Sequence, residues 1–268
     1  MVGDLDLSYS KVTTLPKGLK VSGNLDLRGS KVTVLPKGLE VGGDLYLWYS
    51  SITVLPEGFK VGGDLDLRYS SITVLPEGLE VGGDLYLRDS KITVLPKGLK
   101  VCGNLYLRYS KITVLPKGLK VCGSIHLQQS RITVLPEGFK VGGDLYLAYS
   151  KVKLLPEGLK VGGSLCLWDS KVTVLPEGFK VGGTVILDTA NMSIASQISG
   201  RYEICDLCCH SFTIAKNKLK IGCKTKTLLQ WVRWFEGEEE FDTPRGTERF
   251  EKIERAFNTV KNLLEEKG

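Results

Sequence analysis

The sequence has no run of about 18 consecutive apolar residues, although 42% of its 268 residues are hydrophobic. A helix needs roughly that length to cross a bilayer, so we expect no membrane-spanning helix. The first residues, MVGDLDLSYSKV, also lack the basic start and apolar stretch of a secretory signal peptide. We therefore expect a cytoplasmic protein, while secretion by a route without such a signal stays open.

Histidine is scarce, since His126 and His210 are the only two. His126 takes an outward strand position with no nucleophile or carboxylate partner in its own repeat, which favours a surface contact. The sequence also has no Gly-x-Gly-x-x-Gly motif, no phosphate-binding loop and no paired-carboxylate constellation. These absences predict a protein that is not an enzyme and needs no cofactor.

The seven cysteines are an odd number without the spacing of a disulfide framework, so we expect reduced thiols. Cys102 and Cys122 are 20 residues apart and should stack, where a disulfide is conceivable but reduced thiols are favoured in the cytoplasm. An irregular set of candidate zinc ligands follows near the C-terminus: Cys205, Cys208, His210 and Cys223. Zinc needs four ligands, usually in two close pairs, so buried thiols are favoured over a metal site.

The most prominent feature that the sequence does contain is a 20-residue repeat. A Leu-Pro pair recurs with a spacing of 20 at Leu15, Leu35, Leu55, Leu75, Leu95, Leu115, Leu135, Leu155 and Leu175. A fixed period of this length is typical of solenoids, in which each coil contacts its neighbours and identical columns lie above one another. The sequence predicts nine to ten such coils over residues 1–191.

The sixth repeat shows the pattern within one coil. Leu105 and Leu107 alternate with polar neighbours, which predicts a half-buried strand. Residues 112–115 predict a second short extended piece. Gly103 and Gly118 lie where we expect the chain to turn, at positive φ or where two coils approach closely.

One serine column never varies: Ser10, Ser30, Ser50, Ser70, Ser90, Ser110, Ser130, Ser150 and Ser170. A small hydroxyl can donate to a turn carbonyl and accept from the next coil. The column therefore predicts a ladder of hydroxyl hydrogen bonds with a structural role and no nucleophile.

The spacing Leu-x-Leu-x-x-Ser-x-Ile-x-x-Leu-Pro resembles the leucine-rich repeat, especially the 20-residue bacterial type of secreted effectors, and the match covers residues 2–191. Serine replaces the usual asparagine, and Val-Gly-Gly replaces a leucine. The fold we expect is mainly β, a right-handed parallel β-solenoid that can be flatter than a horseshoe, with two strands per coil. The resemblance implies a parallel sheet on one face and a protein-binding role.

The sequence at each end of the repeat array leads to a separate prediction. The first coil starts without a polar cap and would expose Leu5, Leu7 and an unpaired strand edge. We therefore expect either a monomer with a frayed first coil or a weak end-to-end dimer. At the other end the repeat pattern fails, and residues 192–268 predict a small α+β unit that covers Val185, Leu187 and Ile194.

The C-terminal unit is expected to hold a β-hairpin and two helices. Its first helix would present Leu228, Trp231, Val232 and Phe235 on one face and end at Gly237, with an acidic loop after it. Its second helix would start at Thr243-Pro244 and bury the face formed by Phe250, Ile253, Phe257, Val260 and Leu264. The tail weakly resembles uncharacterised phage and prophage repeat proteins through Ile221, Gly222, Cys223 and Trp231.

Three outward columns follow the core leucines and gather aromatic and arginine side chains. The residues that we expect to bind are Tyr46, Trp48, Tyr49, Arg68, Tyr69, Tyr86, Arg88, Tyr106, Arg108, Tyr109, Tyr146, Tyr149 and Trp168. Tyrosine, tryptophan and arginine are enriched in interface hot spots, so this belt favours a protein partner. The alternatives are a solvated face whose rings stack upon themselves, and nucleic-acid binding by the arginines and tyrosines. Asp6, Asp26 and Asp66 on the same face weigh against nucleic acid.

Overall fold

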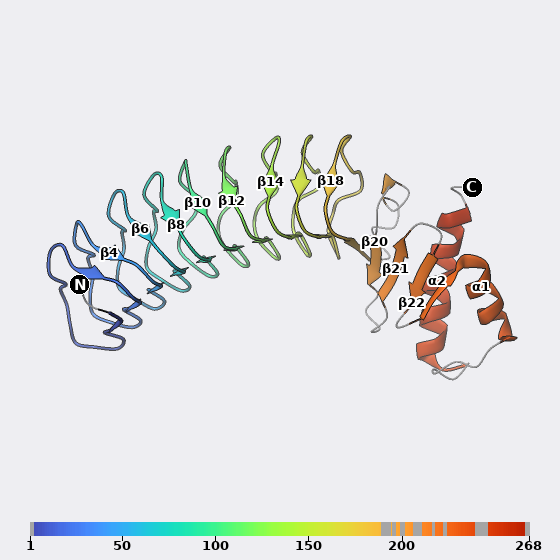
Figure 1. Cartoon of the computed structure of the whole chain (residues 1–268), viewed down its shortest axis with the longest axis horizontal. Coiled ribbons are helices and arrows are strands. Elements are labelled where there is room, and N and C mark those ends of the chain that lie inside the picture. The colour runs from blue at the N-terminus through green and yellow to red at the C-terminus, as the bar shows by residue number, and fades with distance from the viewer. Residues whose placement is uncertain are drawn as a thin grey trace.

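The computed structural model describes residues 3–188, 194, 197–198, 202–205, 211–215, 218–221, 224–238 and 246–265. The repeats form a parallel β-solenoid, whose coils follow one another in a gently curved row with the C-terminal unit at one end (Figure 1). Each coil contributes two short strands to two different sheets. This confirms the expected parallel β-solenoid, although the second strand of each coil does not lie where the sequence predicted it.

The first sheet has 14 strands and runs along the whole array. Its solenoid strands are β1 Leu5–Asp6, β3 Leu25–Asp26, β5 Leu45–Tyr46, β7 Leu65–Asp66, β9 Leu85–Tyr86, β11 Leu105–Tyr106, β13 Ile125–His126, β15 Leu145–Tyr146, β17 Leu165–Cys166 and β19 Val185–Leu187. The pairing is in register with an offset of 20, as in Leu105 opposite Ile125 and Tyr106 opposite His126. Equivalent residues of neighbouring coils therefore lie side by side, which sets the geometry of every column.

The second side of the coil carries a six-stranded and a three-stranded parallel sheet. The strands are β2 Lys20–Val21, β4 Glu40–Val41, β6 Lys60–Val61, β8 Glu80–Val81, β10 Lys100–Val101, β12 Lys120–Val121, β14 Lys140–Val141, β16 Lys160–Val161 and β18 Lys180–Val181. The valines point into the core, and the charged residues before them face outward. These two-residue strands are too short to give a periodic sequence signal.

The extended piece expected at residues 112–115 is not a strand. Ile112 and Leu115 are both buried, whereas Thr113 and Val114 are both exposed. This is a spacing of three between inward residues, and a strand requires a spacing of two. In the described coils this side pairs only through isolated bridges, such as Val114 with Val134.

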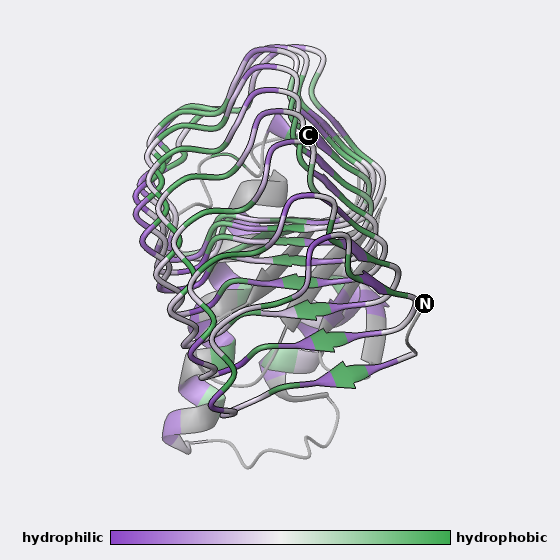
Figure 2. Cartoon of the chain, turned by 90° about the vertical axis from the view of Figure 1, so that its left-hand side faces the viewer, coloured by the Kyte–Doolittle hydropathy of each residue, from purple (hydrophilic) through white to green (hydrophobic). Residues whose placement is uncertain are grey.

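The core is a set of stacked apolar columns. In the sixth coil Val101, Leu105, Leu107, Ile112 and Leu115 are all buried, and the apolar strand residues recur in coil after coil when the array is viewed from its N-terminal end (Figure 2). Each column packs the same side chain on its copy one coil away. Burial thus depends on stacking, as expected for a coil that cannot form a core alone.

A polar ladder, which the sequence did not reveal, ties the coils together. The side-chain oxygen of the residue just before each first-sheet strand accepts the backbone N–H of its counterpart one coil later, as from Asp84 N to Asp64 Oδ1 at 2.7 Å and from Asn104 N to Asp84 Oδ1 at 2.7 Å. Aspartate, asparagine and serine can all occupy this position, because each has a side-chain oxygen that accepts the backbone N–H of the next coil. A Cβ on Gly103 would overlap with Asp84 Oδ1 and the backbone of Gly83, so close approach explains that glycine.

The serine column does not form the expected hydroxyl ladder. Within the described part of the chain, the buried hydroxyls from Ser10 to Ser150 have no hydrogen-bond partner. The serine backbone N–H instead donates to the carbonyl three residues earlier, as from Ser110 to Leu107 at 3.0 Å. Stacked hydroxyls one coil apart are separated by a strand spacing of about 4.8 Å, which is too far for a hydrogen bond.

The C-terminal unit continues the first sheet. β20 Tyr202–Cys205 pairs in parallel with β19, and β21 Ser211–Ala215, β22 Lys218–Ile221 and β23 Lys224–Thr227 follow as antiparallel neighbours. The predicted hairpin between β21 and β22 is present, although its turn residues lie outside the described ranges. Val185, Leu187 and Ile194 are buried, as expected. The sheet therefore crosses the predicted boundary at residue 192, and that boundary stays a prediction.

Two helical segments pack against each other beyond the sheet. α1 Leu228–Arg233 begins with a capping box between Thr227 and Gln230 and continues into the π-helix η2 Trp234–Glu238, so Gly237 lies inside the helical segment and does not end it. α2 Glu248–Glu265 begins later than expected, because Thr247 Oγ1 accepts the N–H of Phe250. The predicted start at Thr243-Pro244 lies outside the described residues.

The aromatic core of this unit matches the sequence in part. Trp231, Phe235, Phe250, Ile253 and Phe257 are buried as expected. Phe235 and Phe257 stack with ring centroids 4.3 Å apart. The side chains of Leu228, Val260 and Leu264 lie outside the described residues. None of the helices within the described ranges combines the length and the apolar character that a membrane crossing needs.

Candidate interaction surface

The column between the two core leucines forms a stack of rings on the outer face of the first sheet. Tyr86, Tyr106, His126 and Tyr146 lie in register on four successive strands. Their ring centroids are 4.6, 4.4 and 4.5 Å apart and the planes are nearly parallel. The faces of the inner rings are covered by their neighbours, so a ligand reaches mainly ring edges.

The hydroxyls of this column are held by the polar ladder. Three tyrosines donate from Oη to Oδ2 of the aspartate two residues earlier: Tyr46 to Asp44 at 2.7 Å, Tyr86 to Asp84 at 3.0 Å and Tyr146 to Asp144 at 2.9 Å. The hydrogen bond to Asp44, followed by burial, raises the pKa of Tyr46 to about 12. Burial and then the bond to Asp144 raise the pKa of Tyr146 to about 12. These phenols stay neutral donors at physiological pH.

His126 differs from the expectation of an exposed surface residue. Its ring is half-buried and lies between Tyr106 and Tyr146. Burial lowers its pKa, and the carboxylates of Asp144 and Asp84 only partly oppose that shift. The neutral imidazole therefore serves as one more ring in the stack.

Two coils replace the tyrosine of this column with an aspartate that an arginine covers. Arg68 binds Asp66 with Nη2–Oδ2 at 2.6 Å and Nε–Oδ1 at 2.9 Å, and Asp66 is only 2% exposed. The guanidinium then lies 5.3 Å from the centroid of the Tyr86 ring. Arg28 and Asp26 repeat the arrangement. The hydrogen bond to the aspartate raises the pKa of each arginine, and the charge of each is matched within its own coil.

Arg88 and Arg108 are placed differently, because their side chains reach toward the outer rim. Both are exposed, and both guanidiniums approach the Tyr109 ring, at 5.3 and 5.0 Å from its centroid. Arg88 pairs with the exposed Asp89 at 3.2 Å. Arg108 forms no ion pair within the described ranges. Arg108 Nη2 donates instead to Tyr109 Oη and Gln129 Oε1, both at 3.4 Å, and the cation–π contacts help to hold the Tyr109 ring in place.

The outer rim consists of the tyrosines that end each strand turn: Tyr9, Tyr49, Tyr69, Tyr109 and Tyr149. All five have positive φ, between 51° and 57°. They are 39% to 68% exposed. Tyr49 stacks on Tyr69 at 5.1 Å and touches Trp48 at 5.2 Å, and Tyr149 meets Trp168 edge-on at 4.9 Å. The sequence does not indicate the positive φ of this column, because residues as different as Gly29 and Asp89 occupy it as well.

All thirteen residues predicted to bind lie on the outer side of the first sheet or in the turn that follows it. The structure divides them into an inner group, held over the sheet by ring stacking, by hydrogen bonds to the polar ladder or by the buried Asp66, and an outer group nearer the turns. The inner group is Tyr46, Tyr86, Tyr106, Tyr146 and Arg68. The outer group is Trp48, Tyr49, Tyr69, Arg88, Arg108, Tyr109, Tyr149 and Trp168. We call the outer group, together with Tyr9 of the same column, the tyrosine rim.

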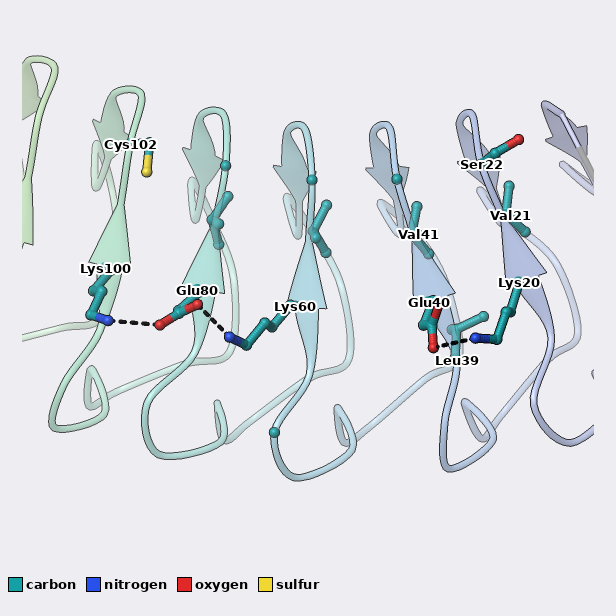
Figure 3. A pocket seen from close by; sticks show the side chains of 16 residues that line it. Lys20, Val21, Ser22, Leu39, Glu40, Val41, Lys60, Glu80, Lys100 and Cys102 are labelled. Carbon is teal, nitrogen blue, oxygen red and sulfur yellow. Dashed lines mark hydrogen bonds and ion pairs between the residues drawn. The ribbon is translucent and has the colours of Figure 1, made fainter. Parts of the chain in front are cut away.

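Two further surfaces were missed at the sequence level. The second sheet carries a groove of about 880 Å³ over β2 to β10, bridged by ion pairs of Lys20 with Glu40 at 2.8 Å and of Glu80 with Lys60 and Lys100 at 2.7 Å (Figure 3). Hydrogen bonds from Lys100 and Lys60 lower the pKa of Glu80 to about 2.

The other missed surface is an apolar ridge, on the side of the coil that lacks a sheet. Its exposed residues recur every 20 positions: Val34, Val54, Val74, Val94, Val114, Val134, Leu154 and Val174. They are 55% to 70% exposed. A continuous apolar row is a rival docking surface.

The side chains of the candidate zinc ligands near the C-terminus lie outside the part of the chain that the structure describes. Cys208, His210 and Cys223 and the side chain of Cys205 lie outside the described residues. Within the residues that are described, no group of three or more His, Cys, Asp or Glu side chains is arranged to hold a metal ion.

Comparison with protein-family models, curated proteins and solved structures gave no significant match. The class of protein is therefore defined by its fold, a parallel β-solenoid of 20-residue repeats with a small C-terminal region containing helices.

Proposed function

We propose that the protein is a non-catalytic interaction scaffold whose tyrosine rim binds a protein partner. The observation that carries the proposal is the left-handed backbone of five bulky, exposed tyrosines. A residue with a Cβ in this conformation costs about 1–2 kcal/mol relative to glycine. Gly29 adopts the same conformation in the second coil, so the coil itself does not require tyrosine there.

Ring contacts offset that cost unevenly along the rim. The Tyr49–Tyr69 stack and the Tyr109 cation–π contacts contribute roughly 0.5–1.5 kcal/mol each. Tyr9 remains 68% exposed. A rim of tyrosine, tryptophan and arginine matches the composition of interface hot spots. From Tyr49 to Tyr149 it spans six coils, or five coil-to-coil steps of roughly 24 Å in total at the usual strand spacing, which suits a standard interface of about 800 Å² per partner.

Nucleic-acid binding, the alternative function, fits this surface less well. Base stacking needs open ring faces, and the inner rings cover one another. Arg28 and Arg68 are already matched by Asp26 and Asp66. We expect no RNA or DNA binding even at about 50 mM salt, and a salt-dependent affinity in a titration would favour the alternative.

We infer a bacterial or phage setting, with host interference as the role. The likeness of the repeat to leucine-rich repeats of secreted bacterial effectors supports this setting, and so does the likeness of the tail to phage repeat proteins. A cytoplasmic location and a monomeric or weakly dimeric state belong to the same proposal.

The test compares two matched surface variants. The rim variant carries Tyr49→Gly, Tyr69→Gly, Tyr109→Gly and Tyr149→Gly, which relieves the left-handed strain and should leave folding intact. The ridge variant carries Val54→Thr, Val74→Thr, Val94→Thr and Val114→Thr. Partners captured with the wild type would be identified by mass spectrometry and their affinities measured by calorimetry.

We expect the rim variant to lose at least a hundredfold in affinity and the ridge variant to bind normally. Unchanged binding by the rim variant, or loss confined to the ridge variant, would contradict the proposal. Circular dichroism and thermal melting of both variants check that the fold is kept.

A further inference from the structure

Cys102 and Cys122 occupy the same position of two neighbouring coils, on the second sheet and away from the tyrosine rim. Both thiols are free and exposed. Their strands pair in register, with Lys100 opposite Lys120 and Val101 opposite Val121. The cysteine backbones also make equivalent hydrogen bonds, from Cys102 N to Val81 O at 2.9 Å and from Cys122 N to Val101 O at 3.0 Å.

This column is crowded, which makes the two thiols conspicuous. Its other described members are Ser22 and a series of glycines, and a Cβ on Gly82 would overlap with the carbonyl oxygen of Gly62. Exposed free cysteines are uncommon, because a thiol is reactive. Cysteine in place of glycine in two successive coils therefore indicates a function at this position.

The spacing of the two thiols follows from the repeat. Equivalent side chains in equivalent backbone conformations are related by a shift of one coil. In these same coils, the measured centroid distances of the ring column are 4.6 Å for Tyr86–Tyr106 and 4.4 Å for Tyr106–His126. The two sulfur atoms are thus expected at about the strand spacing of 4.7–4.9 Å.

That distance fits two sulfurs bridged by one metal ion better than two sulfurs bonded directly. A thiolate–metal bond is about 2.3 Å long, so a linear S–metal–S unit spans about 4.6 Å. A disulfide needs Cβ atoms about 3.8 Å apart, which would pull the two coils together against the stacked leucine columns. Two-coordinate soft ions with thiolate ligands are typical of Cu(I) chemistry.

We propose that Cys102 and Cys122 form a two-thiolate clamp for a soft monovalent metal ion of the Cu(I) class. Binding replaces two S–H bonds with two S–metal bonds, releases two protons and changes no oxidation state. The bound unit carries one net negative charge. The exposed Lys120, two residues before Cys122 on the same face, lies where it can compensate this charge, whereas Lys100 is already paired with Glu80.

Other metals fit the site less well. Zinc requires four ligands, and no third His, Cys, Asp or Glu joins the pair among the described residues. Cys102 also lines one end of the charged groove, where Lys100 is held by Glu80 (Figure 3). The ion would be reached from the groove side by exchange from a small thiol carrier.

The experiment titrates the reduced, full-length protein with Cu(I) held by a colorimetric chelator and counts bound ions by native mass spectrometry. The variants are Cys102→Ser, Cys122→Ser and the double variant, with Cys166→Ser as the matched control, since Cys166 lies on the other sheet. We expect the wild type and Cys166→Ser to bind one more tight equivalent than the double variant. Each single variant should weaken that equivalent at least tenfold.

An equal number of tight equivalents in wild type and double variant would overturn the proposal. Rapid, complete formation of a Cys102–Cys122 disulfide by oxidised glutathione, with two glutathione thiols released and the solenoid intact, would also overturn it, because the coils could then approach as a redox pair. Circular dichroism shows whether each serine variant folds, and the serine at position 22 suggests that the column accepts this side chain.

Discussion

At the level of single residues, the buried carboxylate of Asp66 is the most demanding charge in the array. It is 2% exposed, and Arg68 supplies both the hydrogen bonds and the opposite charge. Arg68→Ala leaves this carboxylate buried and unpaired, so we expect a loss of about 2–3 kcal/mol in the free energy of unfolding, measured by urea denaturation. Arg88→Ala is the control, because its partner Asp89 is exposed; it should cost less than about 0.5 kcal/mol. Equal effects of the two substitutions would contradict this account.

The tyrosine hydroxyls lead to a second prediction at this scale. Tyr46 and Tyr146 have a pKa raised to about 12 in the folded protein, against about 10 in an unfolded chain. Their contribution to stability is complete below pH 10 and is lost as the pH rises through 10 to 12, because the unfolded phenols ionise first. Absorbance at 295 nm should show two phenols, those of Tyr46 and Tyr146, that ionise near pH 12 or together with unfolding. A single transition near pH 10 with the fold intact would count against the stacked arrangement.

At the level of elements, the polar ladder joins each coil to the next through one acceptor. Asp64 Oδ1 accepts the N–H of Asp84, while burial, then Asp44 and Asp84, raise the pKa of Asp64. Asp64→Ala removes the acceptor and should destabilise the protein by about 1–2 kcal/mol. Asp64→Asn keeps an acceptor and removes the repulsion, as Asn24 and Asn104 do in their own coils. We expect this variant to be at least as stable as the wild type at pH 7.

Thermal and urea unfolding of the two variants check this prediction. The sign of the asparagine effect is the informative result. If Asp64→Asn destabilised the protein as much as Asp64→Ala, the negative charge itself would be required, and a ladder based on acceptors alone would be wrong.

At the level of the whole molecule, in-register pairing with an offset of 20 makes each coil a removable unit. Deletion of residues 61–80 joins Lys60 to Val81 and keeps every column aligned. We expect a folded, slightly less stable solenoid whose urea m-value falls in proportion to the lost surface. Deletion of residues 61–70 shifts all later columns by half a coil and should abolish cooperative folding. A folded half-coil deletion would contradict the stacking model.

Much of the fold could be predicted from the repeat. The period predicted the coil length, the alternation around Leu105 predicted the first strand, and the apolar columns predicted the core except for the column of Val114, which is exposed. Other features could not be predicted from the sequence. Two-residue strands such as Lys100–Val101 leave no periodic trace, and the two outward residues Thr113 and Val114 look like part of a strand until their burial is known. The start of α2 at Glu248 could not be predicted, because it depends on the hydrogen bond that Thr247 Oγ1 accepts from the N–H of Phe250.

The sequence alone determined the repeat and most of the columns that face inward, because a period of 20 places equivalent side chains above one another. It did not separate the exposed valine column of Val114 from the buried ones, nor show that the serine column is buried. The tertiary structure decided what happens to the residues that face outward. An outward position becomes a covered ring such as Tyr106, a matched charge such as Asp66 or an exposed ring such as Tyr49 according to its neighbours one coil away. Those neighbours are 20 residues distant in the chain, so no local pattern reports their contacts, and the functional surface emerges only when the coils stack.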